Sequence, residues 1–408
     1  MAVRLAAEPD SLRRSGGGGS GGRGAASPRS VRVNPRLIDD LARYGAQDVS
    51  KCYHCGNCSA VCPFSREPHL FPRRSMRYLQ LGLETRLRGS LEPWLCYYCG
   101  ECSEQCPRGA EPGETMMSMR RWLTAQYDAT GLSRLFYRSW KAELLALAIV
   151  SVLTGVGFLA WGLLNGNFSI YDGPGAFLSS AVVHRFDWGL AAALIVLLAA
   201  NCARMWWFSV VQAAGPKVPL WSYVKQAWLF PFHFFTQARY RECERKRPWA
   251  VHLVLVLSYV TLFTLIVFFV QEMQSGPGID WRVHAFGYAA SVGLVAAVLF
   301  AVRGRRAARE AQYRHSHESD WVFLVLLLAV AVSGLMQHAL HRLGFLPAAN
   351  VVYLLHLMLA VPMLLVEVPF SKWAHMVYRP LAMYFAALLA DAHGAATRSE
   401  APGIARAA

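Results

Sequence analysis

The sequence predicts a mostly α-helical protein in which a small cysteine-rich domain precedes a membrane helical bundle of about six spans. Three observations support this fold class. Hydrophobic residues make up 54% of the 408 residues and charged residues only 16%, apolar runs of membrane-spanning length follow residue 136, and eight of the ten cysteines lie in two boxes before residue 107. A single water-soluble globule does not combine these features.

The two cysteine boxes share one pattern. CYHCGNCSAVCP occupies residues 52–63, and CYYCGECSEQCP occupies residues 96–107. Each is the CxxCxxCxxxCP run of bacterial ferredoxins, in which the fourth cysteine ligates the other cluster when two boxes are present. The sequence therefore predicts a helical ferredoxin-type domain with two 4Fe-4S clusters, one held by Cys52, Cys55, Cys58 and Cys106 and the other by Cys96, Cys99, Cys102 and Cys62.

Other uses of cysteine fit these boxes less well. Zinc ribbons use two separated CxxC pairs and do not need a tight triplet followed by Cys-Pro. Disulfides are rare in the cytoplasm, and a c-type haem needs a histidine directly after CxxC, where Gly56 and Gly100 stand instead. Cys202 and Cys243 lie outside both boxes and are expected to be ordinary thiols.

Six apolar runs follow the boxes, at 144–164, 188–208, 251–270, 284–302, 322–340 and 351–370. Runs of about 20 residues can cross a hydrocarbon core of about 30 Å. The predicted domains are a disordered Gly/Ser-rich tail at 1–32, the ferredoxin-type domain at 33–135, a transmembrane cytochrome b-like helical domain at 136–385, and a disordered C-terminal tail at 386–408.

The basic residues indicate how the bundle is oriented. Lysine and arginine exceed aspartate and glutamate by 41 − 26 = 15, and much of this excess lies between the second and third runs and between the fourth and fifth. Because cytoplasmic loops hold the excess of these residues, we expect a multi-pass protein of the inner (cytoplasmic) membrane with the ferredoxin-type domain and both termini in the cytoplasm. No nucleic-acid partner is needed to explain the charge.

Histidines at the ends of the runs predict haem ligands, because ionisable groups there are costly and usually functional. His252 lies in the first turn of the third run, His375 just beyond the inner end of the sixth, and His356 near its outer end. Imidazole suits haem iron, so two b-type haems are expected. By depth the inner haem takes His252 and His375, and the outer takes His356 with His338, which depth favours slightly, or with His284.

The spacing within the sixth run raises a geometric difficulty. His356 and His375 are 375 − 356 = 19 residues apart, which leaves their imidazoles about 100° apart on a straight helix. Pro362 and Pro369 can kink the helix, or His375 lies past its end. The alternative interpretation is that these histidines are hydrogen-bonded residues at helix ends.

Two segments carry a resemblance to known families. CYYCGECSEQCPRGAEPGETMMSMRRW, at residues 96–122, resembles the ferredoxin-like HdrC component of heterodisulfide reductase, and HLMLAVPMLLVEVPFSKWAHMVYRP, at residues 356–380, is similar to the cytochrome b component of that enzyme and to the gamma subunit of respiratory nitrate reductase. One chain that joins both resembles the membrane component of the quinone-modifying oxidoreductases, the QmoC family. The resemblance covers about residues 33–384.

The resemblance implies a b-type cytochrome with two haems that exchanges electrons with a menaquinone-type pool. It also implies flavin-containing QmoA-like and QmoB-like partner subunits and a connection to adenylylsulfate reductase in sulfur metabolism. The family's haem ligands map onto His252, His356 and His375, and the position of the fourth ligand in the nitrate reductase relative holds Leu262.

The predicted function is therefore a membrane electron-transfer subunit of a quinone-linked oxidoreductase complex. The sequence has no flavin-binding GxGxxG fingerprint after a strand and no P-loop, so we predict no stand-alone catalytic site. Two alternatives stay open: a membrane anchor of a ferredoxin-type domain without haem, and a sulfite-reduction-linked membrane cytochrome subunit.

Overall fold

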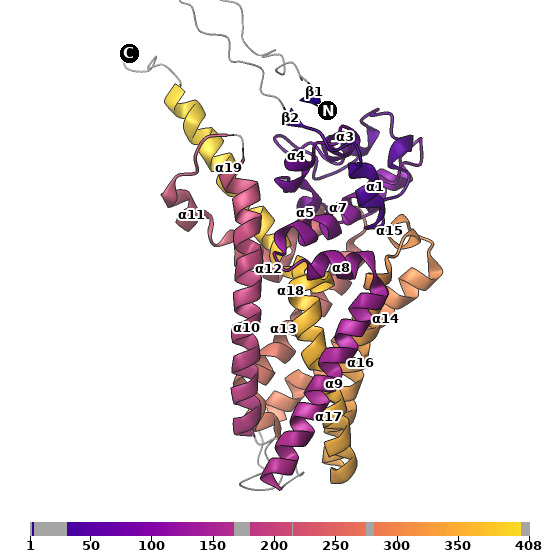
Figure 1. Cartoon of the computed structure of the whole chain (residues 1–408), viewed down its shortest axis with the longest axis vertical. Helices are drawn as coiled ribbons and strands as arrows, with labels where there is room; N and C mark the ends of the chain where they lie inside the picture. The colour runs from indigo at the N-terminus through magenta and orange to yellow at the C-terminus, as the bar shows by residue number, and fades with distance from the viewer. Residues whose placement is uncertain (1, 4–30, 167–179, 214, 275–280, 401–408) are drawn as a thin grey trace, which may run out of the picture.

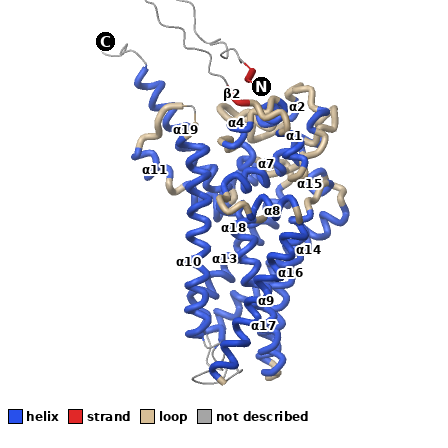
Figure 2. The backbone as a smooth tube through the Cα atoms, viewed as in Figure 1, coloured by secondary structure: helices blue, strands red, loops and turns tan. Residues whose placement is uncertain are grey.

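Short helices of the N-terminal third sit on one end of a bundle of long helices (Figure 1). The computed structural model describes residues 2–3, 31–166, 180–213, 215–274 and 281–400. Helices and loops make up almost all of this part, and its strands are two residues long each (Figure 2). The predicted fold class is confirmed.

The N-terminal domain repeats one local structure at its two cysteine boxes. Gly56 and Gly100 adopt left-handed backbone conformations, with φ of 93° and 92°, and each precedes a short helix. The residues two positions earlier, His54 and Tyr98, are also left-handed, with φ of 59° and 56°. The repeated sequence therefore gives a repeated loop-helix unit, in which glycine supplies the turn that other residues rarely adopt.

The elements of this domain are short. The strands β1 (Ala2–Val3) and β2 (Val31–Arg32) pair antiparallel. The helices are α1 (Leu37–Ala42), the 3-10 turn η1 (Val49–Lys51), α2 (Asn57–Ala60), α3 (Arg73–Gln80), α4 (Glu84–Arg88), α5 (Glu92–Leu95), α6 (Glu101–Glu104), α7 (Pro112–Tyr127) and α8 (Leu132–Arg138).

Six helical segments of the described chain are long and apolar enough to cross a membrane, so the six predicted runs are confirmed as span candidates. Their outward faces carry apolar side chains such as Leu164, Ile195 and Val325, as expected beside lipid. The spans are α9 (Trp140–Asn165), α10 (Ser180–Trp206) continued by the π-helical turn η2 (Trp207–Val211), α13 (Lys246–Gln274), α14 (Trp281–Ala307), α16 (Glu318–Arg342), and a sixth formed by α17 (Leu346–Pro362), the π-helical turn η4 (Met363–Glu367) and α18 (Val368–Phe370).

The segments that connect the second with the third span and the fourth with the fifth lie at the end of the bundle that carries the N-terminal domain (Figure 1). The chain's last helix extends from this end past the N-terminal domain. The connecting segments are α11 (Leu220–Gln226), α12 (Leu229–Thr236), the 3-10 turn η3 (Ala238–Glu242) and α15 (Ala311–Arg314). After the sixth span come the 3-10 turn η5 (Lys372–Ala374) and the last helix, α19 (His375–Glu400).

The sixth span is not a straight helix. Its first α-helical part, α17, ends at Pro362, a π-helical turn and the short α18 follow, and Ser371 then leaves the helical conformation with φ −131° and ψ −144°. The amide of Asn201 on α10 donates to the carbonyl of Pro369 at 3.1 Å, which satisfies a backbone group at the break. The straight-helix angle between His356 and His375 therefore does not apply.

The predicted tails need correction. Residues 386–400, expected to be disordered, continue α19. This segment is rich in alanine, a strong helix former, and Leu388 and Ala392 are buried. In the N-terminal tail, Ala2–Val3 pairs with Val31–Arg32 as a small sheet, whereas the Gly/Ser-rich stretch and residues 401–408 lie outside the described residues.

One hydrophobic core joins the N-terminal domain to the bundle. Trp94 of α5 and Tyr127 of α7 lie with their ring centroids 5.2 and 5.4 Å from Tyr378 of α19. The indole N–H of Trp94 donates to the Tyr127 hydroxyl at 3.3 Å. All three side chains are buried, so the domain is packed against the bundle by large aromatic residues rather than tethered to it.

Candidate functional site

The eight box cysteines form two neighbouring groups. Each group contains the first three thiols of one box and the fourth thiol of the other, because Cys106 lies near Cys58 and Cys62 lies near Cys96 and Cys99. The structure thus brings together the sets that the ferredoxin pattern predicts: Cys52, Cys55, Cys58 and Cys106 in the first group, and Cys96, Cys99, Cys102 and Cys62 in the second.

One partly buried thiol in each group, Cys58 in the first and Cys62 in the second, favours its protonated form until metal binds. Burial, followed by neighbouring thiols, raises the pKa of Cys58 to about 11 and of Cys62 to about 12. Iron must displace these protons, because only thiolates act as ligands. Among the described residues, no three His, Cys, Asp or Glu side chains converge on the position of a single metal ion; a 4Fe-4S cluster instead takes its four thiolates at separate iron atoms.

A ninth cysteine lies beside the second group, which the sequence did not predict. Cys243, directly after η3, is 1% exposed and hydrogen-bonds to Cys99. This bond is the largest influence on Cys99 and lowers its pKa to about 7. The stretch around Cys243 contains no second cysteine at ligand spacing, so no local signal marks it. Cys202 packs against the shared core instead.

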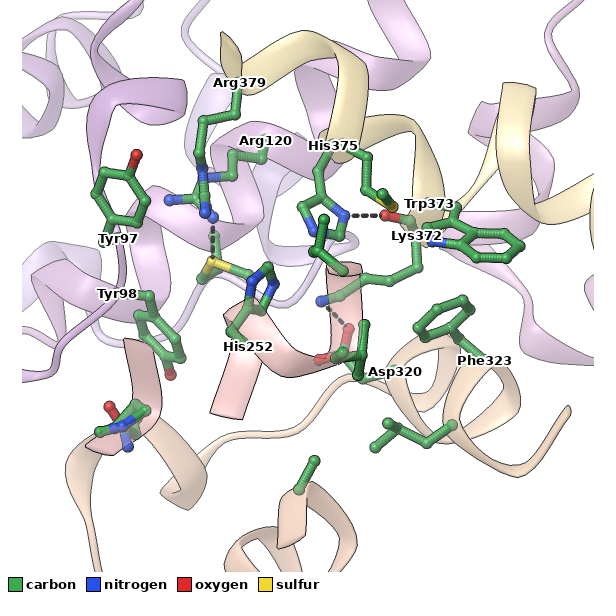
Figure 3. Close-up of a pocket in the computed structure, with 18 of the residues that line it drawn as sticks. Tyr97, Tyr98, Arg120, His252, Asp320, Phe323, Lys372, Trp373, His375 and Arg379 are labelled. Carbon is green, nitrogen blue, oxygen red and sulfur yellow. Dashed lines mark hydrogen bonds and ion pairs between the residues drawn. The ribbon is translucent and has the colours of Figure 1, made fainter. Parts of the chain in front are cut away.

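Two of the predicted haem-ligand histidines lie close together, with their rings tilted by 58° (Figure 3). The ring centroids of His252 on α13 and His375 on α19 are 6.2 Å apart. Nδ1 of His252 lies 2.7 Å from the side-chain oxygen of Gln237, and Nδ1 of His375 contacts the carbonyl of Lys372. Each ring therefore donates its Nδ1 proton to an oxygen and leaves Nε2 available as an acceptor.

Both histidines border a cavity of about 230 Å³. Its walls are largely apolar, with Phe323 and Trp373 at one side, and its charged lining is mostly basic (Figure 3). The buried Nε atoms of Arg305 and Arg379 find no hydrogen-bond partner within the described part of the chain. The cavity therefore suits a large apolar group that carries acidic substituents.

Aromatic rings connect the second cysteine box to the histidine pair. Tyr97, next to Cys96, stacks on Tyr240 of η3 with ring centroids 4.9 Å apart. Tyr240 in turn lies 6.0 Å from His252, and the guanidinium of Arg379 lies 4.5 Å from the Tyr97 ring centroid. The second box and the histidine pair are thus separated by packed side chains of the protein.

A buried ion network holds the elements around the cavity together. Asp320, in the first turn of α16, is 3% exposed. Its carboxylate pairs with Lys372 of η5, with Arg305 of α14 at 3.4 Å, and with Arg121 of α7 at 3.6 Å. Arg121 also pairs with Glu114 at 2.9 Å. One carboxylate therefore connects the N-terminal domain with three parts of the bundle.

The remaining predicted ligands lie near the opposite end of the bundle. His356 is packed against Gly334 and contacts the Ser333 hydroxyl at 3.0 Å. His338 and His284 contact each other, with Nε2 and Nδ1 3.0 Å apart, and His338 also contacts the Tyr288 hydroxyl at 2.7 Å. The structure therefore brings His338 to His284, and among the described contacts it brings neither to His356.

Comparison with known proteins identifies the N-terminal domain. Residues 48–110 match the family model of the 4Fe-4S dicluster domain. This stretch contains both cysteine boxes. No curated protein and no solved structure matches the chain significantly. The chain thus contains a 4Fe-4S dicluster ferredoxin domain, followed by a helical domain with six candidate membrane spans.

Proposed function

We propose that the protein is the membrane electron-transfer subunit of a quinone-linked oxidoreductase complex. Electrons pass between a menaquinone-type quinone, b-type haem in the bundle and the two 4Fe-4S clusters. The proposal rests mainly on the paired imidazoles of His252 and His375. Tyr97 and Tyr240 connect the second cysteine box to this pair through ring contacts. A simple membrane anchor needs no such arrangement.

The histidine pair fits a haem iron. The ring centroids of His252 and His375 are 6.2 Å apart, so the two imidazoles are close enough that both would hold one haem iron. His252 and His375 would bind the iron through Nε2, and the Nε groups of Arg305 and Arg379, which have no partner among the described residues, would bind the acidic substituents of the haem. The haem would supply one-electron chemistry.

The protein's own residues then have distinct roles. Gln237 and the carbonyl of Lys372 orient the two imidazoles, and fixed ligand orientation tunes a metal site. Phe323 and Trp373 exclude water from the cavity. Tyr97 and Tyr240 fill the space toward the second cysteine group and keep the two redox sites close but separate.

The first cysteine group is the proposed point of electron exchange with soluble partners. Cys55 is exposed, and Tyr53 is 71% exposed with Arg108 over its ring at 4.3 Å. From the resemblance described above, we propose flavin-containing QmoA-like and QmoB-like subunits as partners, and adenylylsulfate reductase as the enzyme to which they connect. An outer haem at His356 is also a proposal from that resemblance.

Optical and magnetic spectra test this function. The purified full-length protein is expected to show b-type haem bands in its reduced-minus-oxidised spectrum and two 4Fe-4S signals by electron paramagnetic resonance. His252→Ala and His375→Ala should each remove the inner haem bands and leave both cluster signals. His393→Ala, which changes a histidine elsewhere on α19, is the matched control and should keep all bands. Iron-loaded protein without haem bands would contradict the proposal.

A further inference from the structure

Two carboxyl groups meet inside the bundle, next to the cavity but outside its lining. Glu143 lies in the first turn of α9, and Glu367 is the last residue of the π-helical turn η4. Both side chains are completely buried, and their carboxyl groups contact each other. π-Helical turns frequently occur at functional sites, which makes the position of Glu367 notable.

The carboxyl pair has neutral hydrogen-bond donors but no cation in an ion pair with it among the described residues. Ser371 donates its hydroxyl to Glu143 Oε1, and the Ser371 hydroxyl and the Lys372 backbone amide are the neutral donors beside Glu367. No ion pair between described residues involves either carboxyl group. Two buried carboxylates in contact cannot both be charged. One proton lets one acid donate to the other carboxylate, so the contact requires at least one proton.

Neighbouring charged and titratable groups do not replace that proton. Tyr137 of α8, Asp320 of α16 and Lys372 of η5 face the pair. Lys372 is engaged by Asp320, and that carboxylate is in turn held by three basic side chains. The pair is therefore left with one negative charge, which a second proton can neutralise.

A short connection links the pair to the histidine site. Ser371, which donates to Glu143, is followed by Lys372, whose carbonyl contacts Nδ1 of His375. A change of charge at the histidine site therefore acts on the carboxyl pair across one turn of η5. Glu143 also lies at the end of α9 nearest the N-terminal domain (Figure 1), where a proton from water has the shortest way in.

We propose that Glu143 and Glu367 form a proton-exchange site coupled to electron transfer at the inner histidine site. The oxidised protein holds one proton between the two carboxyl groups. When one electron arrives from quinol or from the clusters, one proton from water joins the pair and protonates both groups; oxidation releases it. This inference rests on the proposed function, because the histidine site must accept an electron.

Infrared and proton-uptake measurements on the full-length protein test the site. In wild type, reduction should change a protonated-carboxyl band that shifts in D2O, and an indicator dye in weakly buffered solution should report proton uptake. E143Q/E367Q should lose this band change and the corresponding uptake. Asp128→Asn, which changes a buried carboxylate with hydroxyl and amide donors, is the matched control and should keep both signals.

The outcomes separate this proposal from the proposed function. Haem bands together with a carboxyl band that does not respond to reduction overturn the proton exchange and leave the function standing. Absent haem bands overturn the function; reduction of the clusters alone should then leave the carboxyl band unchanged. Glu367→Gln alone provides a second variant, and unchanged uptake in a folded, haem-loaded E367Q protein also overturns the exchange.

Discussion

Cys243 shows how a single residue outside the cysteine boxes can affect the second cluster. Its thiol hydrogen-bonds to Cys99, one of the four thiols in the second group. Hydrogen bonds to cluster sulfurs help set the reduction potential, because they stabilise the more negative, reduced state. We therefore expect Cys243 to tune the cluster without ligating it.

Replacing Cys243 tests this role. Cys243→Ala removes the donor and should make the midpoint potential of the second cluster more negative, whereas Cys243→Ser keeps a donor and should shift it less. Redox titration followed by electron paramagnetic resonance measures both. Cys202→Ser is the control, with no expected shift. Loss of the cluster in Cys243→Ala would instead show that this thiol is a ligand.

His69 makes the stability of the N-terminal domain depend on pH. Burial, followed by Arg74 and Arg239, lowers its pKa to about 4, below the value of about 6.5 for an exposed histidine. The unfolded chain therefore binds a proton more readily than the folded one. The stability contributed by neutral His69 is complete above pH 6.5 and is lost as pH falls toward 4.

Thermal unfolding at pH 7 and pH 5 measures this effect. Between pH 7 and pH 5 the free energy of unfolding of the wild type should fall by about 1–2 kcal/mol more than that of His69→Gln, because glutamine takes up no proton. Equal losses in the two proteins would mean that His69 protonates as easily in the fold as outside it.

At the scale of elements, the ion pairs of Asp320 on α16 connect this helix with α7, α14 and η5. Asp320→Asn would leave Lys372, Arg305 and Arg121 without their shared carboxylate. Removing one member of a buried ionic group typically costs about 3–5 kcal/mol. Thermal unfolding should show this loss, and adding Lys372→Met should restore part of it. Asp48→Asn breaks an exposed pair with Lys51 and should cost less than about 1 kcal/mol.

The elements also show what the sequence could predict. The cysteine groups and the His252–His375 pair could be predicted from the sequence, because ligand spacing and depth along a span are local properties. Tyr240, Cys243 and the Asp320 network were not, because only the tertiary fold brings these segments together. The prediction that residues 386–400 are disordered was wrong for the same reason. The alanine-rich composition allows a helix, but only the tertiary fold shows that Leu388 is buried and holds this helix in place.

At the scale of the molecule, the spans and the ferredoxin domain define an orientation that can be measured. Green fluorescent protein fused after α19 should fluoresce, because the basic loops at this end predict the cytoplasmic side. Alkaline phosphatase fused after Gly166, at the far end of α9, should be active outside. The reverse pattern would contradict the predicted topology.

The aromatic core of Trp94, Tyr127 and Tyr378 has a consequence for biogenesis. Trp94 and Tyr127 are translated before the first span, but Tyr378 follows the last one. The ferredoxin domain therefore emerges from the ribosome early and waits for the end of the chain before its packing is complete. If translation stops before Tyr378, the aromatic surface of Trp94 and Tyr127 stays exposed to chaperones and proteases. The ferredoxin domain therefore completes its packing only when all the spans have been synthesised.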